Sequence, residues 1–326
     1  MRALLTGGAG FIGSHVLDLL LAEGGWQIVT LDNFDPFYDP AVKRRNLSTH
    51  LGGERLEVLE CDITDPFLID RLRRHHPFDV VIHLAAKAGV RGSIAEPAAY
   101  HHTNMLGTQA LLDIARDLAI PTFVYASSSS VYGVNVNVPW REDAALEPIS
   151  PYACSKAAGE LLAHAYSHLY GIRSVVLRLF TVYGPRQRPD LAIHHFARKI
   201  LAGQPIQIFG DGTTLRDYTY VADIVAGIRS AMSYQRSPYE VFNLGAGCPV
   251  QLNALVTALA RALDREVEIQ YIGEQAGDVP LTYSSIDKSR QLLGYRPRVP
   301  LDEGLAYFVE WFRRSELGAL QLGSGR

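Results

Sequence analysis

Apolar and polar positions follow two different periods in turn along the first half of the chain. Strand-like apolar runs lie at residues 2–6, 27–31, 55–60, 79–84, 121–126 and 173–179, and helix-like patterns lie near 11–23, 65–75, 103–119 and 152–170. Strands that alternate with helices predict a parallel sheet covered on both faces, which is a doubly wound α/β fold of the Rossmann type. Such a sheet binds ligands at the carboxyl ends of its strands.

The pattern changes after about residue 180, where turns rich in glycine and proline divide the chain into shorter units. These turns lie at 183–189, 210–212 and 245–247. Short units between such turns predict a smaller, mixed α/β substrate domain. We expect a Rossmann domain over residues 1–180, a substrate domain over 181–316 whose segments can interleave with the first, and a tail over 317–326.

The first apolar run leads into a glycine-rich turn with the spacing G-x-x-G-x-x-G, which opens a helix. Gly7 permits a tight turn, Gly10 lets the backbone approach a pyrophosphate, and Gly13 lets the helix pack closely on the strand. The start of the helix offers free amide donors and a positive dipole potential. The turn therefore predicts a dinucleotide site, formed by Gly7, Gly10, Phe11, Ile12 and Gly13.

Asp32 lies 19 positions after Gly13, at the end of the second apolar run. A carboxylate there accepts hydrogen bonds from the adenosine ribose and repels a 2′-phosphate, so the sequence favours NAD over NADP. Later strands end on small or polar residues that should face the same cofactor, because the carboxyl ends of parallel strands share one edge. The cofactor-binding residues predicted at these strand ends are Asp32, Asn33, Asp62, Ile63, Leu84, Ala85 and Ala86.

Tyr152 and Lys156 lie four positions apart in a predicted helix, shortly after a run of four serines at 127–130. Residues at this spacing share a helix face, so the ammonium group can favour the ionised phenol. Tyr152 is therefore a candidate general base. No metal site is expected, because adjacent histidines such as His194 and His195 point about 100° apart on a helix and make poor chelates.

Composition narrows the class of protein. A net charge of −3 gives no electrostatic reason to expect nucleic acid as a partner. No apolar run is long enough to span a bilayer, and the chain starts with the predicted cofactor strand rather than a signal peptide. Three scattered cysteines indicate reduced thiols. We expect a cytoplasmic enzyme with no membrane contact.

Taken in order, these motifs resemble the extended short-chain dehydrogenase/reductase family, and within it the nucleotide-sugar 4-epimerases. The resemblance covers almost the whole chain and rests on residues 6–15, 83–86, 104, 127–133, 152–156, 180–185, 216–218 and 243–245. It implies that bound NAD takes a hydride from C4 of a UDP-sugar while a tyrosine removes the hydroxyl proton. A 4-keto intermediate then turns its other face and receives the hydride back.

The resemblance also implies roles for individual residues. Tyr152 would be the acid/base, Lys156 would lower its pKa and hold the nicotinamide ribose, and Ser128 would hydrogen-bond the C4 oxygen. Among the substrate residues, Gln207 and Phe209 would line the uracil pocket. The implied cofactor-binding set also includes Asn104, Tyr152 and Lys156, and the implied substrate-binding set is Ser128, Ser129, Thr181, Arg188, Gln207, Phe209, Arg216 and Asp278.

The two residues after Ser128 bear on the reaction. Dehydratases of the family carry an Asp-Glu pair there and glucuronate decarboxylases carry a glutamate at the second position, whereas this chain has Ser129 and Ser130. A serine does not readily act as an acid or base at neutral pH, so the sequence favours epimerisation.

Substrate choice is less determined by the sequence. Segments 32–40, 88–91 and 277–283 look most like those of UDP-glucuronate 4-epimerases. Arg188 and Arg91 are both candidates to pair with a sugar carboxylate, although either could instead bind phosphate or form a surface ion pair. UDP-glucose/UDP-galactose 4-epimerisation is the alternative. A decarboxylase, a dehydratase and a non-enzymatic NAD(H) sensor are less favoured.

Two predicted helices, 103–119 and 152–170, resemble those that form a four-helix dimer interface in the family. We therefore expect a homodimer. The apolar residues on these helices could equally cover the sheet, and they are Leu111, Leu112, Ala115, Leu161 and Leu162.

Overall fold

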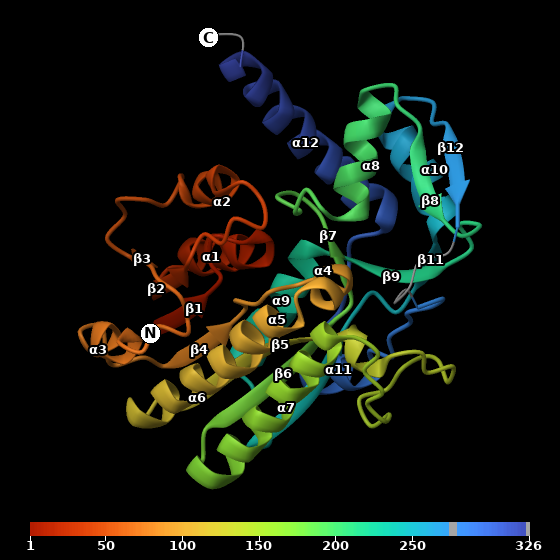
Figure 1. The fold of residues 1–326 in the computed structure, drawn as a ribbon. Helices are drawn as coiled ribbons and strands as arrows, with labels where there is room; N and C mark the ends of the chain where they lie inside the picture. Colours follow the sequence, from red (N-terminus) through yellow and green to blue (C-terminus); the bar gives the residue numbers. More distant parts are fainter. Residues whose placement is uncertain (274–278, 324–326) are drawn as a thin grey trace.

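A seven-stranded parallel sheet forms the centre of the molecule (Figure 1). The computed structural model describes residues 1–273 and 279–323, and within them the sheet has the strand order β10-β6-β5-β4-β1-β2-β3. Its strands are β1 (Arg2–Thr6), β2 (Gln27–Asp32), β3 (Leu56–Glu60), β4 (Val80–His83), β5 (Thr122–Ser128), β6 (Arg173–Leu179) and β10 (Tyr239–Leu244). The predicted α/β class with a doubly wound sheet is confirmed.

Helices cover both faces of this sheet (Figure 1). On one face lie α1 (Phe11–Glu23) and α9 (Val221–Met232), and on the other lie α3 (Leu68–Arg73), α6 (Gly107–Asp117) and α7 (Pro151–Tyr170). Alternate residues of one strand enter the two cores, since Val81 lies in the core that includes Leu111 while Ile82 lies in the core that includes Leu17. Full burial of such a side chain contributes about 1.5–3 kcal/mol, so both layers stabilise the sheet.

The later part of the chain forms two small sheets with their own core. One sheet has the order β11-β9-β7 and the other pairs β12 with β8. The elements are β7 (Thr181–Tyr183), α8 (Ala192–Leu201), β8 (Ile206–Phe209), β9 (Leu215–Tyr220), β11 (Pro249–Gln251), α10 (Leu252–Leu263), β12 (Ile269–Ile272), α11 (Asp287–Leu292) and α12 (Leu301–Gly323). Helices α8, α10 and α12 enclose a shared apolar core.

The boundary at residue 180 does not separate two continuous sheets. Strand β10 pairs in parallel with β6, so residues 239–244 return to the Rossmann sheet as its edge strand. Helix α12 continues to Gly323, where the sequence predicts a tail from 317. Its final residues are mostly good helix formers, such as Leu, Ala and Gln, which explains this continuation.

The predicted helix over 103–119 is interrupted near its start. A π-helical turn spans His102–Leu106, and α6 begins only at Gly107. Within residues 1–180, short helices outside the predicted helical ranges are α2 (Pro40–Leu47), α4 (Val90–Ala95) and α5 (Pro97–His101). Among the described helices, none combines the length and the apolar character needed to cross a membrane.

Candidate active site

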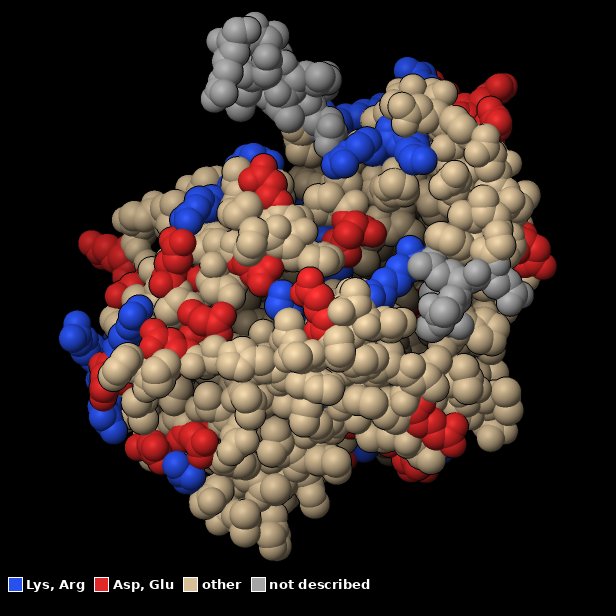
Figure 2. All heavy atoms as spheres, viewed as in Figure 1, with Lys and Arg blue, Asp and Glu red and all other residues tan. Residues whose placement is uncertain are grey.

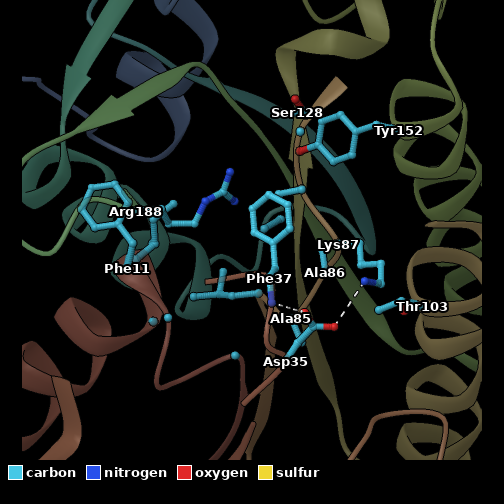
Figure 3. A pocket seen from close by; sticks show the side chains of 18 of the residues that line it. Phe11, Asp35, Phe37, Ala85, Ala86, Lys87, Thr103, Ser128, Tyr152 and Arg188 are labelled. Carbon is cyan, nitrogen blue, oxygen red and sulfur yellow. Dashed lines mark hydrogen bonds and ion pairs between the residues drawn. The ribbon is translucent and has the colours of Figure 1, made fainter. Parts of the chain in front are cut away.

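A cavity of about 520 Å³ opens at the carboxyl ends of the central strands. The strand order reverses between β1 and β4, so the loops after these strands diverge and leave a crevice between them. Figure 3 shows side chains from both halves of the chain around this cavity. Most predicted site residues line it, and these are Gly7, Gly10, Phe11, Ile12, Gly13, Asp32, Asn33, Asp62, Ile63, Leu84, Ala85, Ala86, Ser128, Ser129, Tyr152, Lys156, Thr181 and Arg188.

The glycine-rich turn forms one wall of the cavity. Gly7 has a φ of +75°, which glycine adopts without steric cost. A Cβ atom at Gly13 would lie 2.1 Å from the carbonyl oxygen of Gly7, so the first turn of α1 packs too closely on the loop for any side chain. Helix α1 has no side-chain cap at Gly10. Its first turn therefore presents the cavity with a helix N-terminus suited to a pyrophosphate.

Asp32 lies at the end of β2 and is only 7% exposed. Its carboxylate accepts hydrogen bonds from the amides of Ala9 (3.1 Å) and Phe34 (2.9 Å). Burial raises the pKa of Asp32, while these amides and the charge of Lys43 oppose the increase. The carboxylate lines the cavity in a fixed orientation, as a ribose acceptor requires.

A chain of buried hydrogen bonds fixes the loop after β4. The Thr6 hydroxyl accepts from the amide of Ala85 (3.1 Å) and contacts His83 Nδ1 (2.8 Å), and His83 Nε2 contacts the Thr108 hydroxyl (3.0 Å). Burial lowers the pKa of His83 to about 3, with the charge of Lys156 as a second cause, so the ring is neutral. Through Thr6, the His83 ring fixes the backbone of Ala85, so that this small residue lines the cavity.

The sequence predicts that Asn104 binds the cofactor. In the structure it is not among the residues that line the cavity and lies behind its wall. Its side chain accepts from the amide of Lys87 (2.8 Å) and donates to the carbonyl of Lys87 (2.9 Å) and the hydroxyl of Ser155 (2.9 Å). These bonds tie the loop after β4 to helix α7. Asn104 therefore positions the wall through its neighbours.

Helix α7 and strand β5 bring the three predicted catalytic residues together. Ser150 caps α7 by accepting from the amide of Ala153, so Tyr152 and Lys156 lie in its first two turns. Ser128 is the last residue of β5; its hydroxyl donates to the Ser130 hydroxyl (3.0 Å) and lowers the pKa of the Tyr152 phenol. Figure 3 shows this phenol directed toward Ser128 at the cavity. The arrangement can move a proton at a bound hydroxyl group.

Burial and two neighbouring groups act on the pKa of Tyr152, and burial also limits the charge that Lys156 can contribute. Burial raises the pKa of Tyr152, and the groups that oppose this increase are the Ser128 hydroxyl and the charge of Arg188. Lys156 is 4% exposed and donates to the carbonyl of Ala126 (2.8 Å). Burial lowers the pKa of Lys156 to about 7, with Glu160 opposing the decrease, so its positive charge is only partial near neutrality.

Arg188 reaches the cavity from the loop between β7 and α8, and Figure 3 shows its side chain directed toward the centre. Its Nη2 atom donates to Asp190 Oδ2 (2.8 Å), and its guanidinium lies 5.7 Å from the ring centre of Phe37. The side chain is 19% exposed. A fixed cation therefore lies in the same cavity as the Tyr152 phenol.

The residues predicted to bind the nucleotide lie outside the cavity lining. Gln207 and Phe209 lie on β8, and Arg216 lies on β9. The guanidinium of Arg91, from α4, lies 4.9 Å from the Phe209 ring centre and links the two parts of the chain. In Figure 2, basic atoms lie in the hollow between these parts. Asp278 falls outside the described residues.

The sequence predicted Asn33 in the cavity but not the rest of the segment after β2. Asp35, Phe37 and Tyr38 line the cavity, and Asp35 forms an ion pair with Lys87 (3.2 Å) from the loop after β4 (Figure 3). The available signal was the run of aromatic residues and turn-forming Asp and Pro at 34–40, directly after the predicted ribose acceptor.

These features define a class: an enzyme of Rossmann fold that binds a dinucleotide and transfers a proton at a hydroxyl group. The family model described as the NAD dependent epimerase/dehydratase family matches residues 3–245. The chain belongs to this family. The match confirms the resemblance found in the sequence and, with it, the prediction of an enzyme with NAD as cofactor.

Individual relatives and solved structures within this family are similar to the chain over nearly its whole length. The chain is 38% identical over 314 residues to UDP-glucuronate 4-epimerase of Thermodesulfobacterium geofontis, which covers 96% of either protein. The structure of UDP-glucuronic acid 4-epimerase from Bacillus cereus with UDP-glucuronic acid and NAD matches with a TM-score of 0.91 and 34% identity, covering 97% of this chain and 100% of that chain. UDP-glucose 4-epimerase from Thermotoga maritima with UDP-glucose matches with a TM-score of 0.89 and 35% identity, at the same coverage.

Proposed function

We propose that this protein is an NAD-dependent UDP-sugar 4-epimerase that interconverts UDP-glucuronate and UDP-galacturonate. The observation that carries the choice of sugar is the position of Arg188, whose cation shares a cavity with Tyr152 and Ser128. A permanent charge with donors in a fixed fork suits a carboxylate. The similarity to UDP-glucuronate 4-epimerases over nearly the whole chain supports the same substrate.

The site residues divide the chemistry among them. Bound NAD would supply the reversible hydride transfer at C4 of the sugar. Tyr152 takes the proton of the C4 hydroxyl and gives it back, because a sugar hydroxyl is too weak an acid to lose its proton without a positioned base. Ser128 orients the C4 oxygen, and Lys156 adds positive charge. The walls that would hold NAD are the glycine-rich turn and Asp32.

With an acidic sugar, the 4-keto intermediate can decarboxylate, and Arg188 can oppose this side reaction. Loss of hydride and proton at C4 gives a 4-keto sugar, and with a carboxylate at C5 this product is a β-keto acid that can lose carbon dioxide. Departure of carbon dioxide moves the carboxylate electrons into the ring. A cation that holds the carboxylate stabilises its charge and opposes that step. Of the two arginines that the sequence offers, Arg188 is the one that lines the cavity, whereas Arg91 stacks on Phe209.

The main test is product analysis by NMR after separate incubation with UDP-glucuronate and UDP-glucose. We expect UDP-galacturonate from the first and little turnover of the second. Substitution Arg188→Met should raise KM for UDP-glucuronate about tenfold or more and increase the share of decarboxylated product. Unchanged KM and unchanged product shares in Arg188→Met would refute the carboxylate role.

A second candidate function is UDP-glucose/UDP-galactose 4-epimerisation. The similarity to the Thermotoga maritima enzyme supports it, and it needs the same Tyr152 chemistry without a carboxylate partner. Efficient conversion of UDP-glucose, with no effect of Arg188→Met on that reaction, would favour this candidate. A decarboxylase would instead produce UDP-xylose, and an NAD(H) sensor would convert neither sugar.

We further propose that the protein is a cytoplasmic homodimer with its interface on α6 and α7. Leu111, Leu112 and Ala115 are fully buried beneath these helices, so they cover the sheet. Leu161 and Leu169 are 66% and 65% exposed on α7. Figure 2 shows few charged side chains over the middle of this region. A helical face with few charges over its middle and with exposed leucines fits a second copy of the chain.

We also propose that residues 181–316, apart from β10, form the UDP-sugar-binding part of the enzyme. The nucleotide then lies toward β8 and β9, near Gln207, Phe209 and Arg216. The Arg91–Phe209 contact supports this role, because Arg91 lies on α4, whose Gly92 and Ala95 line the cavity, and its guanidinium lies 4.9 Å from the Phe209 ring centre on β8. Thr181, at the start of β7, lines the cavity where the sugar would lie.

A further inference from the structure

The loop at residues 184–190 carries Arg188 into the cavity. It connects β7 to α8 and contains two residues with positive φ, Gly184 (+143°) and Arg186 (+62°). A non-glycine residue with positive φ requires support from its surroundings. Within the loop, the amide of Gln187 donates to the carbonyl of Gly184 (3.2 Å). The Arg188 guanidinium also donates to Asp190 within the loop, and further support comes from outside the loop.

Helix α1 supplies that support at two consecutive loop residues. His15 Nε2 donates to the carbonyl of Pro185 (2.9 Å), and Arg186 Nη2 donates to Asp18 Oδ2. Burial lowers the pKa of His15, the bond to the Pro185 carbonyl opposes this decrease, and the charge of Arg186 acts in the same direction as burial. The helix that begins the dinucleotide site therefore holds the loop that bears Arg188.

The second oxygen of Asp18 reaches a different segment. Asp18 Oδ1 lies 2.6 Å from Nε2 of His50, which follows helix α2. Helix α2 in turn follows the segment at 33–39, whose Phe37 ring lies under the Arg188 guanidinium at 5.7 Å. One carboxylate thus links both segments that meet at Arg188.

We propose that Asp18 is a positioning residue that sets the sugar selectivity of the enzyme by holding the 184–190 loop, and with it Arg188, at the cavity. This inference rests on the proposed role of Arg188 toward a sugar carboxylate. Displacement of a binding group by about 1 Å is enough to lose much of its contribution. Loss of the Asp18 contact should therefore weaken binding of the acidic sugar and leave a neutral sugar unaffected.

The partial exposure of the contact makes it suitable for mutation. The side chains of Asp18 and Arg186 are 32% and 23% exposed, and ion pairs at such positions contribute little to global stability. Asp18→Asn removes the charge with almost no change in volume, and Arg186→Met removes the same bond from the other side. Glu23→Gln is the matched control, because Glu23 lies on the same helix at 33% exposure and pairs with Arg229 (2.9 Å), away from the loop.

The experiment is calorimetric titration of the NAD-bound protein with UDP-glucuronate and with UDP-glucose. Asp18→Asn and Arg186→Met should each raise Kd for UDP-glucuronate about tenfold and change Kd for UDP-glucose less than about twofold. Glu23→Gln should change neither. In the double variant Asp18→Asn/Arg188→Met, the loss for UDP-glucuronate should equal that of Arg188→Met alone, because Asp18 acts through Arg188.

Four outcomes would overturn the inference or the proposed role on which it rests. Equal losses for both sugars would show that Asp18 has only a general structural role. Additive losses in the double variant would show that it does not act through Arg188. If Arg188→Met itself binds UDP-glucuronate normally, the proposed carboxylate role fails. If Arg188→Met is impaired while Asp18→Asn and Arg186→Met bind normally, only the role of Asp18 fails.

Discussion

Lys156 should destabilise the ligand-free protein in a pH-dependent way. The side chain is 4% exposed, and burial lowers its pKa to about 7 from an ordinary value of 10.5. The unfolded chain therefore holds more protons than the folded chain between about pH 7 and pH 10.5. As the pH rises through this window, the free energy of unfolding should increase. The reason is that protonation of Lys156 stabilises the unfolded chain, and this stabilisation weakens as protons become scarcer.

The size of the effect follows from the two pKa values. Each unit of difference corresponds to about 1.36 kcal/mol, so the penalty for burying the ionisable amine is about 4 kcal/mol at pH 7. At pH 9 the folded chain holds the amine neutral, and the remaining penalty is about 2 kcal/mol. The expected change between the two pH values is therefore about 2 kcal/mol.

The perturbation that tests this is Lys156→Met, which keeps most of the side-chain volume and cannot ionise. Urea unfolding of the NAD-free wild type and variant at pH 7, 8 and 9 gives the free energy of unfolding of each. The free energy of unfolding of the variant minus that of wild type should be about 2 kcal/mol larger at pH 7 than at pH 9. The variant should also lose epimerase activity. A stability difference that is the same at all three pH values would refute the reasoning.

Three further substitutions test other parts of the site. Tyr152→Phe should lower kcat for epimerisation at least about a hundredfold, because it removes the acid/base group, while calorimetry still detects binding of NAD and UDP-sugar; a kcat near wild type would contradict the assignment. Gly13→Ala should weaken NAD binding in a fluorescence titration, because the new Cβ would lie 2.1 Å from the Gly7 carbonyl oxygen. The control Gly273→Ala should bind NAD normally, because its Cβ would meet nothing within 4 Å. Leu161→Arg places a charge on the proposed interface and should shift the mass in light scattering from dimer to monomer, and a dimeric variant would place the interface elsewhere.

The sequence predicted the Rossmann half well because its signals are local. The apolar run of β1, the glycine spacing and Asp32 each carry their own physical reason, and the parallel topology then brings them to one edge of the sheet. The same logic located Ser128 and Tyr152, which come from neighbouring elements. Each of these residues lines the cavity.

The remaining features depend on contacts between distant segments. The Asn104 side chain bonds the backbone of Lys87 and the Ser155 hydroxyl, and neither partner can be read from the spacing around Asn104. The return of β10 to the first sheet likewise depends on tertiary packing, since its apolar pattern would suit either sheet. The effect of Lys156 on Tyr152 could not be sized from helical spacing alone, because spacing does not reveal the cost of burying the ammonium group, which lowers the pKa of Lys156 to about 7.

Arg188 joins substrate choice to acid–base chemistry. Its charge lowers the pKa of Tyr152 against the effect of burial. A sugar carboxylate bound to Arg188 would cancel part of that charge, so with an acidic sugar the phenol must rely more on Ser128 and on the protonated fraction of Lys156. A neutral sugar would leave the full field of Arg188 acting on Tyr152. The loop held by Asp18 and His15 therefore sets both which sugar binds and how basic the tyrosine is when it does.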